Sequence, residues 1–411
     1  MQVVHDRCCG LDVHKKRLSA CLLVRDPPRT RHKEVRSFGT TTPDLLQLRA
    51  WLTDVGCTHI AMESTGSYWK PVYNLLEDAF ALVLANAQHI KALPGRKTDV
   101  GDAEWIADLL QHGLIRASFI PPKPLRELRE LTRYRKSLIQ ERSAEVNRLQ
   151  KVLEGANIKL ASVATSVMGQ SGQLILAALV DGVTDAEVLA NLALGKLRRK
   201  LPDLEQALVG NMGPHQRFVL RQQLAHIHAL DDMIEQCSIE IAMRFAPLDE
   251  TIARICTIPG VGRRTAETVL AEIGWEMDRF PTANHLASWA GVCPGNHESA
   301  GKRTSGKTRK GSRWLHEALV EAARAAARTR HTYLAAQYHR LAARRGGNKA
   351  AVAVAHTILI IIYHLLQDGG VYQDLGATYF DDIDRERVQR RLIRRLEAMG
   401  CQVQVTLSST T

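Results

Sequence analysis

The 411-residue sequence predicts an α/β domain followed by a mainly helical chain. Three observations support this fold class. Residues 1–40 alternate between apolar and polar side chains, as short strands do. Strand-like and helix-like segments then alternate up to about residue 120. From residue 121 onward the patterns are mostly helical. At this length we expect two or three domains rather than one core.

The first domain is expected to hold a mixed sheet. Strands are predicted at 7–13, 17–24, 32–38, 57–64 and 80–87, and helices at 42–56, 68–79 and 97–110. The charged segments between the first three strands fit as turns. Three strands in series, followed by alternating helices and strands, favour a sheet of mixed direction. We therefore assign residues 1–120 to an α/β domain.

Composition and hydrophobic pattern divide the remainder of the chain into residues 121–250, 251–380 and 381–411. A long charged helix opens the first of these regions, and its apolar residues recur with a period of about 3.5. This stripe consists of Leu125, Leu128, Leu131, Leu138, Leu149 and Val152. Two interpretations stay open: a helix packed on its own domain, or a coiled-coil arm for self-association. The last region is expected to be a charged helical tail.

The formal net charge of +12 favours a polyanionic partner, most simply nucleic acid. An anionic membrane surface is the rival partner, but no Lys/Arg-rich helix with a Trp/Phe face supports it. The longest apolar run, residues 351–366, is shorter than the roughly 20 residues that span a bilayer. We predict that this run is a core helix and that the protein has no membrane partner.

The eight cysteines form no CxxC pair and no zinc-type spacing with histidine. In a chain of this size they are expected to be buried thiols of a reducing cytoplasm. The N-terminal residues lack the apolar segment of a signal peptide. These features predict a cytoplasmic protein.

Four carboxylates of the first domain could share a metal site. Asp12 lies near the end of the first predicted strand, and Glu63 ends the fourth. Asp99 and Asp102 are three residues apart on the predicted helix 97–110, so both would face the same way. Strand ends and the helices that follow them are where distant residues converge in α/β domains. Oxygen ligands suit hard divalent cations, and paired cations catalyse phosphodiester transfer.

Simpler interpretations compete at each position. An Asp at a strand end is usually solvated, and Asp99 as an acid at a helix start would gain only about 0.3–1 kcal/mol from the helix dipole. An ATPase of the sugar-kinase and actin type also begins with an acid on its first strand. That class needs a glycine-rich phosphate loop next, whereas Asp12 is followed by bulky and charged residues. The metal site is the better explanation of the four acids together.

A candidate nucleic-acid contact lies at residues 256–274, which fit a helix-hairpin-helix. Gly260 and Gly262 permit a tight turn, and their backbone N–H groups could approach a phosphate at a helix N-terminus. Arg263 and Arg264 follow directly. Such contacts hold the sugar-phosphate backbone without reading its sequence. A plain pair of helices with a glycine turn is the alternative.

A basic loop follows about thirty residues later. Residues 301–313 contain six Lys or Arg and no acid. We predict phosphate contacts from Lys302, Arg303, Lys307, Arg309 and Lys310. The hydroxyls of this loop belong to Ser299 and Ser305, and a serine attacks well only when a base, a metal or cations activate it.

The stretches 10–16, 61–69, 97–110, 258–274 and 286–315 together resemble the DEDD transposases of IS110-type insertion sequences, the IS116/IS110/IS902 family. The resemblance covers most of the chain and has the right order. It implies a RuvC-like first domain with an RNase H fold and a D-E-D-D site for Mg²⁺, with Mn²⁺ as a substitute. Those acids fall on Asp12, Glu63, Asp99 and Asp102. It also implies a mainly helical C-terminal transposase domain.

The family's second domain carries a serine that attacks the DNA phosphate and leaves a phosphoserine link. Here that serine falls on Ser299. Many relatives have a glycine at the position of Ala300, so Ser305 remains the fallback. The resemblance further implies DNA partners (element ends and target), a structured guide RNA, a homo-oligomer (dimer or tetramer), and a prokaryotic protein that associates with the nucleoid. Two alternatives are a Mg²⁺-dependent Holliday-junction-type endonuclease that uses water as nucleophile, and a non-catalytic nucleic-acid binder.

Overall fold

The computed structural model describes residues 3–26, 30–64, 66–85, 90, 101–294, 297–299, 302–305, 308, 311–383 and 385–404. By its internal contacts the chain divides into two units, Met1–Pro121 and Pro122–Thr411.

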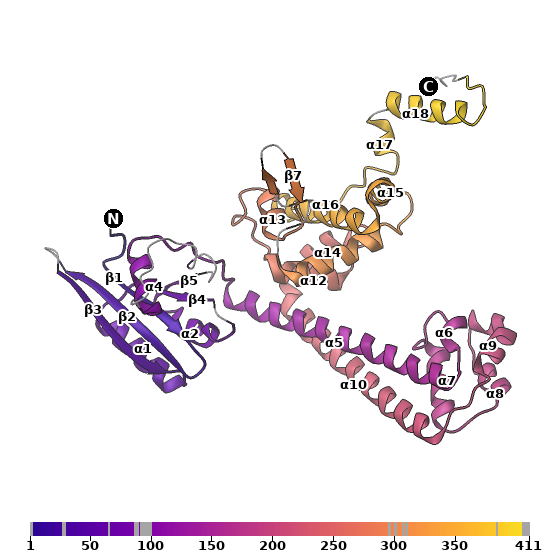
Figure 1. Ribbon diagram of the computed structural model, residues 1–411, viewed down its shortest axis with the longest axis horizontal. Helices are drawn as coiled ribbons and strands as arrows, with labels where there is room; N and C mark the ends of the chain where they lie inside the picture. The colour runs from indigo at the N-terminus through magenta and orange to yellow at the C-terminus, as the bar shows by residue number, and fades with distance from the viewer. Residues whose placement is uncertain are drawn as a thin grey trace. The chain divides into compact units, whose positions relative to one another are not determined.

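The first unit is built on a five-stranded mixed sheet, as the sequence predicts. Its strands are β1 (Arg7–Val13), β2 (Arg17–Asp26), β3 (Thr30–Gly39), β4 (His59–Glu63) and β5 (Ala81–Ala85), in the order β3-β2-β1-β4-β5. The first three strands pair antiparallel, while β4 lies parallel to β1 and β5 lies parallel to β4. Figure 1 shows this sheet with its helices.

Helices cover both faces of the sheet because its strands are apolar on both sides. Helices α1 (Thr42–Asp54) and α2 (Trp69–Leu76) pack on one face, where Leu11, Leu22 and Ile60 are fully or almost fully buried. Helix α4 (Asp102–Gln111) packs on the other face, against Cys8 and Ala61. The alternation of side chains along β1 therefore sends Cys8, Gly10 and Asp12 toward α4.

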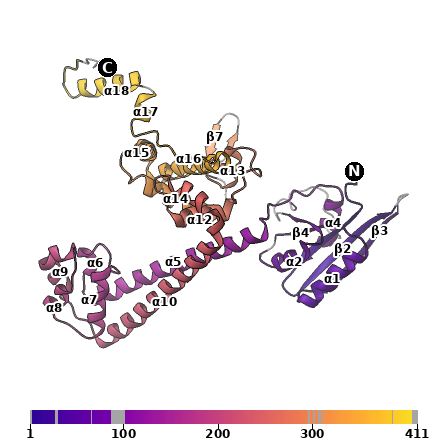
Figure 2. The same cartoon turned by 180° about the vertical axis from the view of Figure 1, so that it is seen from behind.

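The second unit begins with a stalk of two long antiparallel helices, α5 (Lys123–Gly155) and α10 (Pro214–Phe245). Ion pairs join the two helices where α5 begins and α10 ends (Arg244–Glu127) and near the middle of both (Arg142–Asp231). The helices α6 (Leu160–Val163), α7 (Gln170–Val180), α8 (Ala186–Asn191), η1 (Leu197–Lys200) and α9 (Leu201–Leu208) form a small cluster at the end of the stalk. Figure 2 shows this arrangement from behind.

The sequence allows the long helix either to pack on its own domain or to form a coiled-coil arm for self-association. For most of its apolar stripe the first interpretation holds. Leu125 and Leu128 are buried at its start, and Leu138 packs with Leu230 and Ile234 of α10. Leu149 is buried against the helices at the stalk's end. These side chains are covered by the same chain, so the stripe is not a face left open for a second copy.

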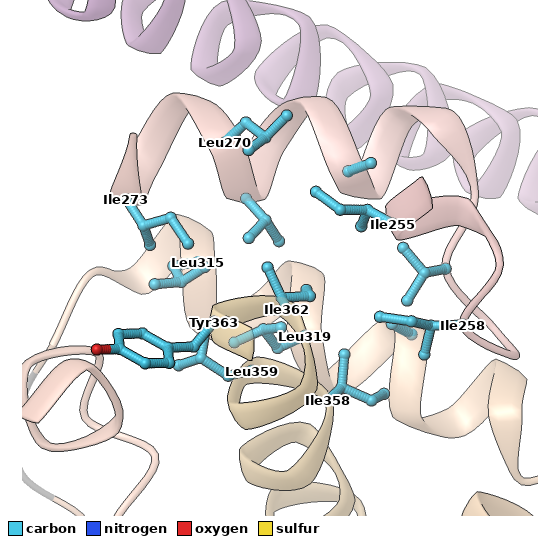
Figure 3. Packing of buried hydrophobic residues seen from close by; sticks show 14 of the residues in the cluster. Ile255, Ile258, Leu270, Ile273, Leu315, Leu319, Ile358, Leu359, Ile362 and Tyr363 are labelled. Atoms are coloured by element: carbon cyan, nitrogen blue, oxygen red, sulfur yellow. The ribbon is translucent and has the colours of Figure 1, made fainter. Parts of the chain in front are cut away.

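The rest of the second unit is a helical body. It contains η2 (Ala246–Leu248), α11 (Asp249–Cys256), α12 (Arg263–Ile273), α13 (Ala283–Trp289), β6 (His297–Ser299), β7 (Lys302–Ser305), α14 (Arg313–Ala326), α15 (Tyr333–Arg345) and α16 (Gly347–Asp368). Figure 3 shows side chains of α11, α12, α14 and α16 meeting in its core. The short α17 (Tyr379–Asp382) and α18 (Arg385–Glu397) follow.

Helix α16 contains the predicted core helix. It is the one helix of the described residues that is long and apolar enough to cross a membrane. Nine of its residues are nevertheless buried, among them Val354, Ile358 and Ile362. This packing against α13, α14 and α15 is that of the central helix of a folded body.

The cysteines follow the sequence prediction only in part. All eight are free, and the four in the first unit are buried. Cys237, Cys256 and Cys293 are only partly buried, and Cys401 is exposed. The prediction of uniform burial is wrong for these four because they lie on amphipathic helix faces, on loops or near the chain end, rather than inside a sheet.

Candidate active site

Two of the predicted acids end neighbouring parallel strands. Asp12 is the last but one residue of β1, and Glu63 is the last residue of β4. The parallel register pairs Leu11 with Met62, so the next step along both strands places Asp12 beside Glu63. Glu63 itself pairs with Ala85 of β5, which is buried under α4. Both carboxylates thus lie on the α4 side of the sheet, at the carboxyl ends of the strands.

Helix α4 rests directly on the backbone of β1. A Cβ atom at Gly10 would lie 2.3 Å from both the Ala103 carbonyl oxygen and the Ala107 nitrogen. Two residues earlier on the strand, the Cys8 thiol lies 3.8 Å from the Ala107 carbonyl oxygen. The strand and the helix therefore run in opposite directions. Asp12, two residues further along the same strand face, lies toward the first residue of α4.

That first residue is Asp102, which is exposed. The topology therefore brings Asp12, Glu63 and Asp102 toward one end of the sheet. Asp12 Oδ2 lies 3.1 Å from His14 Nε2, and 26% of the Asp12 side chain is exposed. Among the described residues, no group of three or more His, Cys, Asp or Glu side chains is close enough to hold a metal ion. The three acids share a region without forming a closed ligand set by themselves.

Asp99 lies outside the described residues, so its position relative to the other acids stays a prediction. The predicted start of the helix at residue 97 is wrong, because α4 begins at Asp102. Gly101 has an extended backbone (φ −60°, ψ 148°) and caps the helix. Helix propensity favoured an earlier start, but the N-cap at Gly101 sets the boundary.

The candidate serines lie on a two-stranded antiparallel hairpin. Ser299 ends β6 and pairs with Lys302, so it flanks the short connection between the strands. Ser305 ends β7 and pairs with His297 at the opposite end of the hairpin. Of the predicted phosphate contacts, Lys302 and Arg303 lie on β7, whereas residues 307, 309 and 310 lie outside the described part of the chain. The two serines therefore occupy opposite ends of one small ribbon.

The turn between α11 and α12 is tight, and Gly260 is essential to it. Gly260 has φ +85°, and a Cβ atom there would lie 2.4 Å from the Ala322 carbonyl oxygen of α14. Gly260 therefore serves close packing of the turn on α14. Gly262 differs, because no atom lies within 4 Å of the place where its Cβ would be. Gly262 caps α12 with an extended backbone and leaves the helix N-terminus open.

The two arginines after this turn also differ. Arg263 pairs with Asp249 at 2.7 Å and with Glu267 at 3.0 Å. These carboxylates, Asp249 foremost, raise the pKa of Arg263. Arg264 is exposed, and it lines a surface pocket together with Lys136 and Glu321, which pair with each other. The charge of Arg263 is thus offset by protein carboxylates, and Arg264 is the better placed of the pair for a phosphate.

The hydrogen bonds that hold the end of the basic loop were not predicted from the sequence. Glu272 of α12 is buried and accepts hydrogen bonds from Arg133 Nε at 2.7 Å and from the Ser312 hydroxyl at 2.9 Å. Arg129 binds the carbonyl oxygens of Ala271 and Glu272, and burial lowers its pKa to about 10. Ser312 is the N-cap of α14, at the exit of the loop. The stalk helix α5 therefore fixes one end of the basic loop.

A signal for these hydrogen bonds exists in the sequence, but it is weak. Arg129 and Arg133 are one helical turn apart on α5, and Glu272 interrupts the apolar pattern of α12. Gly311 is a second sign, because a Cβ there would lie 2.2 Å from the Ala290 carbonyl oxygen. The chain must therefore pass directly over the end of α13 before it enters α14.

Two family models match the chain. The first covers the region of the acids, and the second covers the region of the glycine turn and the serine hairpin. Residues 9–158 match the IS110-type DEDD transposase model, which is described as "Transposase". Residues 252–340 match "Transposase IS116/IS110/IS902 family". The chain is an IS110-family transposase. The first match contains Asp12, Glu63 and Asp102, and the second contains the glycine turn and the serine hairpin. The protein is accordingly an enzyme that acts on DNA.

Curated relatives agree with this assignment. The transposase for insertion sequence element IS1111A of Coxiella burnetii is 26% identical over 332 residues, which cover 78% of this chain and 80% of that protein. The IS116 uncharacterized 44.8 kDa protein of Streptomyces clavuligerus is 29% identical over 257 residues, which cover 54% of this chain and 62% of that protein. A pilin gene-inverting protein of Moraxella bovis is 40% identical over 52 residues, or 13% of this transposase and 16% of that protein.

Proposed function

We propose that this transposase cuts and rejoins DNA strands with a metal-bound acid site in its first unit and a serine nucleophile in its second. The observation that carries the proposal is the convergence of Asp12, Glu63 and Asp102 at one end of the sheet. The strand order β3-β2-β1-β4-β5, with parallel pairing only from β1 onward, also fits a RuvC-like RNase H fold. In that fold the first strand carries an acid, as β1 does here.

The chemistry of these residues fits a hard divalent cation. Asp12, Glu63 and Asp102 offer only carboxylate oxygens, and with Asp99 the set reaches four acids. Mg²⁺ prefers such ligands and retains several waters, and Mn²⁺ accepts the same donors. The Asp12 carboxylate is partly exposed, so solvent reaches it. When bound, the metal would neutralise charge on a phosphate and lower the pKa of an attacking hydroxyl or water.

Ser299 is the proposed nucleophile, and Ser305 is the fallback. In the proposed step, the Ser299 hydroxyl oxygen forms a bond to a DNA phosphorus while the bond from phosphorus to one sugar oxygen breaks. The serine proton passes to a base, and the released sugar oxygen takes up a proton. Ser299 flanks the hairpin connection beside Lys302, where a cation would stabilise the charged transition state. Rejoining is the reverse attack by a sugar hydroxyl on the phosphoserine.

The proposed nucleic-acid contacts are made by groups that are not already used in packing or in ion pairs within the protein. Gly262 and Arg264 at the start of α12 are better placed than Gly260 and Arg263, which already serve packing and ion pairs. The basic loop adds Lys302 and Arg303, and residues 307, 309 and 310 continue it. A structured guide RNA and a homo-oligomer belong to the same proposal, since the net charge of +12 suits two polyanions as well as one.

One relative favours a recombinase over a simple nuclease. The Moraxella bovis protein is named for inverting a pilin gene, which is a rearrangement of DNA. Rejoining of strands is built into a phosphoserine mechanism, because the link preserves the energy of the broken bond. The alternative, a Mg²⁺-dependent Holliday-junction-type endonuclease, uses water and leaves free ends.

A covalent-adduct experiment tests the proposal. The transposase is incubated with Mg²⁺, labelled DNA carrying the element's ends and the noncoding RNA of the element, and the products are resolved on a denaturing gel. We expect a protein–DNA adduct with the wild type and with Ser305→Ala. We expect none with Ser299→Ala, Asp12→Asn or Glu63→Gln.

The other outcomes are equally informative. An adduct that persists in Ser299→Ala and disappears in Ser305→Ala would move the nucleophile to Ser305. Full cleavage without an adduct in Ser299→Ala would support the endonuclease. Unchanged activity in both Asp12→Asn and Glu63→Gln would refute the metal site and leave a non-catalytic role for the first unit.

A further inference from the structure

The body of the second unit contains a cavity of about 670 Å³ beside the serine hairpin. Its walls are formed by the segments before and after the hairpin and by one face each of α15 and α16. The lining side chains are Val292, Pro294, Thr308, Gln337, Leu341, Arg345, Asn348, Lys349, Val352, Ala353, His356 and Thr357. The volume lies within the range of about 300–1,000 Å³ that is typical of sites for small organic ligands.

The cavity is tied to the base of the hairpin. Pro294 and Thr308 form an antiparallel bridge just before β6 and after β7, and both residues line the cavity. The hairpin that carries Ser299 thus projects from the cavity's wall. A group bound in the cavity would lie next to any strand that the hairpin holds.

The two helices present consistent faces to the cavity. Gln337, Leu341 and Arg345 are four residues apart on α15, so they form one stripe. On α16, Lys349, Ala353 and the residues one turn further along form the matching stripe. The apolar side chains lie between polar ones, as they do in pockets that hold a flat ring and fix its edge.

Among the described residues that line the cavity, the charged side chains are Arg345 and Lys349, and none is a carboxylate. Arg345 and Lys349 are exposed, and within the described part of the chain neither forms an ion pair. His356 is half-buried, and desolvation lowers its pKa, which disfavours a further positive charge at this wall. Two free cations at the edge of a largely uncharged cavity suit an anionic group attached to an uncharged body.

One buried acceptor also lacks a partner. Gln337 Nε2 donates to the Thr357 hydroxyl at 2.9 Å, and that hydroxyl donates to the Ala353 carbonyl oxygen at 3.2 Å. The Thr357 hydroxyl donates its only proton to Ala353, so it must accept from Gln337. The amide nitrogen of Gln337, rather than its oxygen, therefore faces Thr357. Gln337 Oε1 is then buried with no hydrogen-bond partner among the described residues. This acceptor has almost no exposed surface, so a bound molecule reaches it only when the Gln337 side chain turns toward the cavity. An N–H donor there would recover the roughly 1–3 kcal/mol that an unpaired buried acceptor costs.

We propose that this cavity binds one unpaired nucleotide of a nucleic-acid strand. The base enters between the apolar side chains and donates an N–H to Gln337 Oε1, while its phosphate contacts Arg345 and Lys349. Enzymes that do chemistry on a base hold it unstacked in such a pocket, and unstacking costs least for a base that is already single-stranded. The proposal rests on the proposed function in one respect, namely that the hairpin beside the cavity holds a strand.

A fluorescence experiment on the full chain tests this binding without any cleavage. The probe is a single-stranded DNA hexamer with one 2-aminopurine and a 5′ fluorescein, titrated in EDTA. We expect a saturable change in 2-aminopurine emission, as the base leaves its stack, together with a rise in fluorescein anisotropy. Ala353→Phe places a ring in the cavity between α15 and α16, and it should abolish the 2-aminopurine response while the anisotropy titration shifts by about threefold or less.

A second variant guards against misfolding of the first. Lys349→Glu changes an exposed side chain, and it should weaken the 2-aminopurine response about tenfold or more through loss of a charge-assisted contact. Arg330→Glu is the matched control, because it reverses one exposed charge of the same body outside the cavity. An unchanged 2-aminopurine response in both Ala353→Phe and Lys349→Glu would overturn the proposal.

Further titrations show whether the bound nucleotide belongs to DNA or to RNA. An RNA hexamer of the same sequence that competes equally supports the shared nucleotide chemistry, and a tenfold preference for either strand assigns the cavity to DNA or to RNA. A 2-aminopurine within a stable duplex should give no response, and an equal response there would overturn binding of an unpaired base. Failure of the proposed function appears separately, as loss of the covalent adduct with binding retained.

Discussion

The close approach of β1 and α4 at Gly10 makes a sharp test of how the acid site is assembled. In Gly10→Ala the added carbon would lie 2.3 Å from two backbone atoms of α4, and neither atom can rotate away. Restoring van der Waals contact requires α4 to retreat by about 1 Å. Because α4 is packed through five buried apolar residues, we expect a cost of about 1–3 kcal/mol. The start of α4, with Asp102, moves as well.

Hydrogen exchange followed by mass spectrometry measures this cost locally. We expect exchange of the α4 peptide in Gly10→Ala to be faster by about five- to 150-fold, the equivalent of 1–3 kcal/mol. DNA cleavage should fall by about 10²-fold, since a displacement of 1 Å is costly at a catalytic site. Gly101→Ala is the control, because its Cβ would meet no atom within 4 Å and only a cap preference of about 0.5 kcal/mol is lost. Equal exchange in the two variants would refute the reasoning.

Three further predictions concern the second unit and the cysteines. Gly260→Ala should cost about 2–4 kcal/mol in urea unfolding, because its positive φ and the α14 backbone both oppose a side chain, whereas Gly262→Ala should cost less than about 1 kcal/mol. Glu267→Gln should destabilise the chain by about 3–5 kcal/mol in the same assay, because it leaves the buried Arg135, 2.8 Å away, without its counter-charge. Burial raises the pKa of Cys57 from 9.0 to about 12, so its thiol keeps its proton and peptide mapping should find it unmodified by iodoacetamide at pH 9 in the native protein, but modified after unfolding.

The fold of the first unit could be predicted from the sequence because its signals are local. Strand alternation located β1 to the residue, and the later strands and helices differ from their predicted bounds only at the ends. Asp12 and Glu63 could also be found, since a carboxylate that ends an apolar strand is conspicuous. Their pairing in register depends on parallel β1 and β4, which the mixed-sheet prediction already contained.

The start of α4 shows where local reasoning failed. The segment 97–110 looks amphipathic throughout, yet the helix begins at Asp102 because Gly101 takes an extended backbone. A similar limit applies to the glycine turn. The motif correctly indicated two helices and a tight connection, but Gly260 faces α14 rather than an open surface. Which side of a turn is covered depends on a helix sixty residues away.

The same reasoning explains why charge alone assigns partners poorly in this chain. Arg263 and Arg264 are adjacent in sequence and equal in formal charge, but Asp249 and Glu267 neutralise only the first. Nothing in the sequence distinguishes Arg345 and Lys349 from other basic residues, because they lie in an ordinary helical pattern. Their value comes from the absence of an acidic neighbour in the described residues around the cavity. A phosphate is attracted to unbalanced charge, so the tertiary pairing of each arginine, more than its place in a basic run, determines where this transposase can hold a strand.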